Sequence, residues 1–227
     1  MSFPQEPAAE ETTPGEREDA CILDAVVCIH FAGANLNHVL VAALEYMKWV
    51  ILVPAEVCDE IVRKDAKYPG LRKRWLALER SDRIRVLPAL EVGSAPGRVV
   101  EVLEEIRDLE FDQALRRSRD LGECVVVAHG VHLSEQGHEV TLLMDDAEGR
   151  RLADEWSLQH LTIEDVLVLG IHAGCFDTLD ALKHAYHRLQ QFGSGLPDFP
   201  RTALVKDYRE WRAASEDTSG AGSMPVE

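Results

Sequence analysis

The sequence predicts an α/β fold, a three-layer α/β/α sandwich around a central, mainly parallel sheet of about five strands. The first observation is that short apolar runs of strand length alternate with longer segments in which apolar residues recur at helical spacing. The second is that residues 49–53 (WVILV) are apolar throughout, which is typical of a parallel strand buried on both faces. Because consecutive parallel strands are joined by helices, this alternation favours a sheet with helices on both sides.

The expected strands are short and apolar, and they are residues 20–23, 49–53, 84–87, 140–144 and 161–163. The expected helices are residues 25–32, 35–48, 56–64, 98–119 with a break near 110–111, 123–133, 147–159 and 178–191. A further helix contains residues 166–169 and opens at Thr162 or Glu164, and the basic segment 67–80 is expected to be helical after Gly70.

The length of 227 residues allows one large domain or two small ones. Residues 1–18 lack hydrophobic periodicity and are expected to be disordered. We expect the folded domain to span residues 19–192, with residues 193–212 as a C-terminal extension that packs on it. Residues 213–227 are mostly small and polar and predict a disordered tail.

Composition favours a soluble globular protein, with 46% hydrophobic and 28% charged residues. No apolar run approaches the roughly 20 residues of a membrane span, and none resembles a signal peptide, so we expect a cytoplasmic protein with no membrane partner. The five cysteines form no Cys-x-x-Cys pair, so they are expected to be reduced core residues rather than disulfides or zinc ligands.

The formal net charge of −16 argues against a simple nucleic-acid binder, which usually has a basic surface. Part of the acidity lies in residues 6–19, and another part would be explained if a group of carboxylates held a metal ion. The charge therefore lowers the expectation of nucleic-acid binding without excluding it.

Five carboxylates occur where the elements of the expected sheet begin or end. Asp24 follows the first strand, Asp145 and Asp146 follow the fourth, and Glu60 and Glu123 lie near the starts of helices. Because sites in parallel α/β folds lie outside the carboxyl ends of the strands, we expect these side chains to converge on one pocket. Carboxylate oxygens are the ligands that Mg²⁺ and Mn²⁺ prefer.

Simpler roles exist for each acid. Asp24 is a good helix-capping residue, and Glu123 at a helix start would favour the helix dipole. Glu60 has two rivals on the same helix, Glu56 and Asp59, and is itself explained as a surface residue. Which of the two aspartates at 145 and 146 is the ligand stays open, with a preference for the second.

The motifs around these acids resemble those of the PIN domain (VapC-like, or PilT N-terminus, family). They are ILDAVV with Asp24, PAEVCDEI with Glu60, DLGE with Glu123, and LLMDDAEGRRLA with Asp146. This is the nuclease fold of VapC-type toxins, related to the flap endonucleases. Each motif alone is weakly specific, but the four occur in the expected order over roughly residues 20–192.

The resemblance implies a hydrolase, a metal-dependent endoribonuclease that cuts RNA phosphodiester bonds with Mg²⁺ or Mn²⁺. Asp24, Glu60, Glu123 and Asp146 match the family's catalytic acids, and Asp145 is the second candidate for the last metal ligand. It also implies an RNA substrate, an antitoxin-type protein partner and a homodimer, for which the apolar segments 38–47 and 166–173 are candidates.

The chain departs from a compact toxin in its extra sequence between the second and third motifs and its C-terminal extension, which puts the toxin role in doubt more than the fold. The alternative is a non-catalytic PIN-like module that binds a protein or RNA partner. Asp120 is expected to cap a helix or support a ligand. Arg150, Arg151 and the basic runs 72–74 and 116–119 are candidates for phosphate contact, or simply solvated helix surface.

Overall fold

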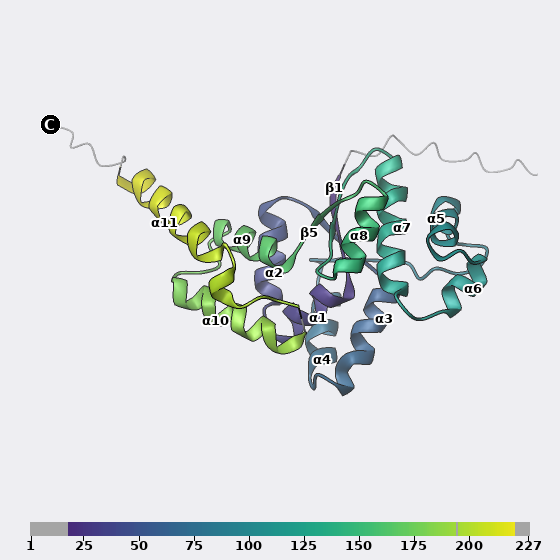
Figure 1. Cartoon of the computed structure of the whole chain (residues 1–227), viewed down its shortest axis with the longest axis horizontal. Helices are drawn as coiled ribbons and strands as arrows, with labels where there is room; N and C mark the ends of the chain where they lie inside the picture. Colours follow the sequence, from purple (N-terminus) through teal and green to yellow (C-terminus); the bar gives the residue numbers. More distant parts are fainter. Residues whose placement is uncertain (1–17, 194, 221–227) are drawn as a thin grey trace, which may run out of the picture.

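The computed structural model describes residues 18–193 and 195–220. It confirms the α/β fold, with a five-stranded, all-parallel sheet in the order β3-β2-β1-β4-β5 flanked by helices (Figure 1). The strands are β1 (Asp19–Leu23), β2 (Val50–Pro54), β3 (Arg85–Leu87), β4 (Glu139–Leu143) and β5 (Gln159–Leu161).

The central strand β1 pairs with β2 on one side and β4 on the other. Ile22 lies opposite both Leu52 and Leu142, and all three side chains are buried. Helices cover both faces of the sheet, so a strand that is apolar throughout, such as β1, buries its side chains on both sides. The sheet therefore carries the middle of the core.

The helices are α1 (Ala25–Gly33), α2 (Asn37–Tyr46), α3 (Ala55–Arg63), α4 (Leu71–Glu79), α5 (Gly97–Arg107), α6 (Phe111–Arg116), α7 (Leu121–Glu135), α8 (Ala147–Glu155), α9 (Ile163–His172), α10 (Leu179–Leu189) and α11 (Leu204–Gly220). Three short 3₁₀ turns complete the described elements, η1 (Lys64–Ala66), η2 (Gln190–Phe192) and η3 (Phe199–Arg201). In Figure 1, α5 and α6 lie on the far side of α7 from the sheet, and α11 extends away from the body on the opposite side. The expected break near residue 110 is present, between α5 and α6, where Asp108 adopts a left-handed conformation with φ of 49°.

The predicted fifth strand is displaced. Residues 161–163 were expected to form it, but β5 ends at Leu161, and α8 ends at Glu155 rather than 159. The reason is a capping box. The Thr162 side chain accepts a bond from the backbone N–H of Asp165, and the Asp165 carboxylate accepts one from that of Thr162. Thr162 therefore begins a helix instead of continuing a strand.

The C-terminal part of the chain packs against α9. Leu204 and Tyr208 are buried, and the Tyr208 hydroxyl donates to the carbonyl of Asp177 at 2.9 Å. Since α11 continues to Gly220, the tail expected from residue 213 is helical as far as residue 220. Of the segment 1–18 predicted to be disordered, residues 1–17 lie outside the described residues.

The two apolar helices considered for a homodimer, α2 and α9, pack on each other within the chain. Their buried residues include Leu40 and Leu44 on α2 and Val166 and Leu167 on α9. Most of this apolar surface is therefore used inside the fold, and the homodimer stays a prediction. Among the helices of the described residues, none combines the length and the apolar character needed to cross a membrane.

Replacing Leu142 by alanine should lower the free energy of unfolding by about 2–5 kcal/mol, because it removes a fully buried side chain between β1 and α7 and leaves a cavity. Urea denaturation monitored by circular dichroism measures this change. The control is Val92→Ala, since Val92 is 68% exposed and its loss should change stability by less than about 0.5 kcal/mol. Equal effects of the two substitutions would contradict the assignment of β4 to the core.

Candidate functional site

Asp24 stands at the carboxyl end of the central strand. Its backbone N–H donates to the carbonyl of Leu143 at 3.0 Å, which extends the pairing of β1 with β4 by one residue. Its carboxylate accepts a bond from the N–H of Val26 at 3.1 Å and caps α1, and the residue is only 2% exposed. The capping role considered from the sequence is therefore real, and it holds the carboxylate at a fixed place above the sheet.

Glu123 enters from α7, in the first turn of that helix. Gly122 allows the close approach, because a Cβ there would lie 3.2 Å from Oε2 of Glu60 and 3.9 Å from Oδ1 of Asp24. On its other side, the Glu123 side chain lies against Gly149 of α8, 3.6 Å from where a Cβ would be. Because Gly122 and Gly149 have no side chain, the start of α7 can pack closely against α3 and α8, with the carboxylates of Glu60 and Glu123 at the contacts.

Among the three acids of α3, Glu60 is the one whose carboxylate lies beside Gly122, close to Asp24. Glu56 instead accepts a bond from the N–H of Leu90 at 2.6 Å and so holds the loop after β3. Asp59 is exposed. Glu60 is partly buried and lies 3.9 Å from Nζ of Lys64, one turn further along the chain.

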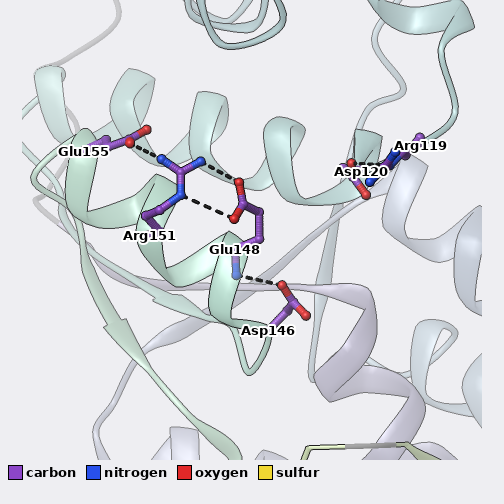
Figure 2. A network of polar contacts seen from close by, with 6 residues as sticks. All are labelled: Arg119, Asp120, Asp146, Glu148, Arg151 and Glu155. Carbon is purple, nitrogen blue, oxygen red and sulfur yellow. Dashed lines mark hydrogen bonds and ion pairs between the residues drawn. The ribbon is translucent and has the colours of Figure 1, made fainter.

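The two aspartates after β4 have different surroundings. Oδ1 of Asp145 accepts a bond from the N–H of Ile163 at 3.1 Å, at the start of α9. Asp146 caps α8 by accepting from the N–H of Glu148 at 2.8 Å, and its carboxylate is otherwise exposed (Figure 2). The charge of Asp146 acts on Asp24 and Glu123. Both aspartates line a cavity that Glu60 also lines, and Asp145 is in addition bonded to the start of the next helix.

Asp24, Glu60 and Glu123 line a cavity of about 580 Å³, which we name the acid pocket, together with Asp120. Asp146 lines an adjoining cavity, to which Glu60 also belongs. Burial raises the pKa of Asp24 to about 6, two backbone N–H bonds lower it, and Glu60 and Asp146 raise it. Burial also raises the pKa of Glu123 to about 8, and neighbouring carboxylates add to the rise. Within the described ranges neither Asp24 nor Glu123 forms an ion pair with a basic residue. These two buried carboxyl groups are thus the members of the pocket that lack a basic partner among the described residues.

The donor set fits a hard divalent cation. All candidate ligands are carboxylate oxygens, and they come from segments fixed by β1, α3, α7 and β4. In the arrangement of residues 18–193 and 195–220, no three His, Cys, Asp or Glu side chains form a ready-made ligand group. Coordination would therefore require partly exposed side chains, Glu60 and Asp146, to turn toward the pocket.

Three basic residues line the acid pocket, of which Arg119 belongs to the basic run 116–119 predicted as a candidate for phosphate contact, whereas Arg63 and Lys64 were not predicted. Arg63 and Lys64 line it from α3 and η1, one turn beyond Glu60, and that spacing is the signal that could have identified them. Arg119 also lines it and pairs with Asp120 at 3.1 Å (Figure 2). Arg151, a candidate for phosphate contact, pairs with Glu148 and Glu155 along α8. The expected role of Asp120 as a helix cap holds only for its backbone position, since its side chain makes no capping bond.

Arg107 positions one wall of the pocket although nothing in the sequence indicates it. From the end of α5 its guanidinium donates to the carbonyls of Arg117 and Arg119, at 2.6 and 2.9 Å. It also donates to Sγ of Cys124 on α7 at 3.5 Å. These bonds fix the short segment that leads from α6 into α7, where Asp120 takes a left-handed conformation with φ of 55°.

A scan against models of protein families and a search of curated proteins each found no match to this chain. The PIN-like resemblance therefore rests on the four motifs and stays a prediction.

The contribution of Asp24 and Glu123 to the stability of the metal-free protein should fall as pH rises from 5 to 8, whereas buried His129, whose pKa is lowered to about 4, contributes in the opposite direction at the acidic end of this range. Asp24 and Glu123 bind protons more tightly in the folded than in the unfolded chain, so their deprotonation in this window favours unfolding. Glu123→Gln should flatten the decline and be more stable than wild type at pH 8, by about 1–3 kcal/mol. Urea denaturation in chelator across this pH range measures both effects.

The control for this substitution is Glu101→Gln, because the Glu101 side chain is 66% exposed on α5. Its pH profile should run parallel to that of the wild type. A Glu123→Gln profile that also runs parallel to the wild type would contradict the raised pKa of Glu123.

Proposed function

We propose that the protein is a metal-dependent endoribonuclease of the PIN type, which hydrolyses RNA phosphodiester bonds at a Mg²⁺ or Mn²⁺ site. The observation that carries this proposal is the placement of Asp24, Glu60 and Glu123 around one cavity at the edge of a parallel sheet, with Asp146 in the adjoining cavity. Their motifs are far apart in the sequence, and two of these acids lack a basic partner in the described structure. Such uncompensated carboxylates are costly in a protein unless they serve a function.

The four acids would have different roles in this site. The bonds that fix Asp24 to α1 and to β4 give the site a rigid anchor, and Glu123 closes it from α7. Glu60 and Asp146 are more exposed and so would face the substrate. When bound, the metal supplies a water of lowered pKa and neutralises charge on the phosphate.

The rim explains how an acidic protein could hold an anionic strand. Arg63, Lys64 and Arg119 surround the acid pocket, and the side chains of Lys64 and Arg119 are 46% and 82% exposed. Phosphates contacting this rim would release counterions, so binding should weaken with salt. The chain as a whole has a net charge of −16, but basic residues are concentrated locally around the acid pocket.

Mn²⁺ should raise the melting temperature of the wild type, because only the folded chain brings the four acids together. The Asp24→Asn, Asp146→Asn double variant should lose this response. Asp59→Asn is the matched control, since Asp59 precedes Glu60 on α3 but is exposed and lines neither the acid pocket nor the cavity beside it. Differential scanning fluorimetry with and without chelator measures the shift, and an unchanged shift in the double variant would refute the metal site.

The wild type should cut mixed structured and single-stranded RNA with Mg²⁺ or Mn²⁺ and not with chelator. Asp24→Asn should reduce the rate by at least about 100-fold, since it removes a charged ligand at the anchor of the site. Asp59→Asn should keep most of the activity, because Asp59 is exposed and lines neither cavity. Intact metal binding with no cutting of any RNA would instead favour the non-catalytic PIN-like module.

A further inference from the structure

A second cavity, of about 460 Å³, adjoins the acid pocket. We name it the side pocket. Glu60 and Lys64 line both cavities, so whatever enters one lies next to the other. Asp145 and Asp146 also line the side pocket, whereas Asp24 and Glu123 line the acid pocket, so Glu60 is the acid shared by the two cavities. A strand of nucleic acid cut at the acids would therefore continue into this second cavity.

One wall of the side pocket is aromatic. Tyr68, just after η1, and Phe192, in η2, are 124 positions apart in the numbering, yet their ring centroids lie 5.5 Å apart at an interplanar angle of 59°. The Phe192 ring lies on α1, where a Cβ at Gly33 would clash with it at 2.3 Å. Both rings are only partly buried at the edge of the core. A planar ligand could therefore stack on this wall while the core supports it from behind.

Three basic side chains share the same cavity, Lys64, Lys67 and Arg150. Nζ of Lys67 lies 5.0 Å from the centre of the Tyr68 ring, and the Arg150 guanidinium donates to the backbone carbonyl of Asp145. Within the described part of the chain, neither Lys67 nor Arg150 pairs with a carboxylate. Their charge is thus available to an anion, beside a surface suited to a planar ring.

We infer that the side pocket binds one unpaired nucleotide next to the cleaved phosphate, with its base on Tyr68 and Phe192 and its phosphate at Lys67 and Arg150. This inference rests on the proposed function, which places the cleaved phosphate at the acids. The nucleotide must be unpaired because a base within a duplex is covered by its neighbours and cannot stack on a side chain. A base that covers the Tyr68 ring displaces the Lys67 ammonium toward the phosphate, so the two contacts support each other.

The test is binding of a fluorescein-labelled single-stranded RNA hexamer and of the same hexamer in a duplex, measured by anisotropy in the Asp24→Asn background with Mg²⁺. Tyr68→Ala should weaken binding of the single strand by about 5- to 150-fold, whereas Tyr68→Phe, which keeps the ring, should bind normally. The duplex should bind more weakly than the single strand, and its affinity should be the same for the wild type and Tyr68→Ala. Tyr46→Ala is the matched control, because Tyr46 is a 53% exposed tyrosine on α2 outside both cavities.

Lys67→Ala gives a second readout that does not depend on the core, because Lys67 is exposed. It should reduce the dependence of log affinity on log salt concentration by about 0.7, the value for one lost phosphate contact on a single strand. Unchanged affinity of the single strand for Tyr68→Ala, or equal binding of duplex and single strand, would overturn the inference.

Measuring RNA cleavage alongside binding distinguishes a failure of the nucleotide site from a failure of the proposed nuclease activity. If the wild type cuts RNA and Tyr68→Ala alters neither affinity nor KM, the side pocket is not a nucleotide site although the nuclease proposal stands. If the wild type cuts no RNA but binds single strands through Tyr68, the nucleotide site is supported and the nuclease proposal fails.

Discussion

The structure depends on the parallel pairing of β1 with β4. This pairing sets Leu23 opposite Leu143, and the next backbone bond joins Asp24 to Leu143. It therefore fixes the distance between the first acid and the segment that carries Asp146. The helices that follow, α1 and α8, are both capped by these aspartates. A shift in register would move the first acid away from the segment that carries Asp146, so the fold and the site share one constraint.

Burial then gives the site its chemistry. A carboxylate removed from water favours its protonated form unless a cation replaces the lost hydration. At Asp24 and Glu123 this burial is reinforced by neighbouring acids. Basic residues stand at the rim instead of at the centre. This separation leaves the centre to a metal and the rim to an anionic substrate, which is the arrangement that the proposed hydrolysis requires.

The sequence predicts the parts of the site that depend on strand ends. The fold class and the position of Asp24 follow from apolar runs, and Glu123 lies in the first turn of α7 as expected. The expectation that Glu60 lies near a helix start is wrong, because α3 begins at Ala55 and its first turn contains Glu56 instead. The different surroundings of Asp145 and Asp146 could not be predicted from the sequence, because they depend on a bond from the N–H of Ile163, which is distant in the chain. The bonds of Arg107 and the contact between Tyr68 and Phe192 could not be predicted either, because they also join residues that are not adjacent in the sequence. The fifth strand was misplaced because the Thr162–Asp165 capping box outweighs β propensity at its end.

The most direct test of the account is isothermal titration of Mn²⁺ into the protein at pH 7 in two buffers with different ionisation enthalpies. At this pH, Glu123 is largely protonated in the metal-free protein, since burial raises its pKa to about 8. Coordination should therefore occur with release of about one proton per metal ion bound. Binding without proton release, or no binding at all, would contradict the claim that the buried carboxylates form a metal site.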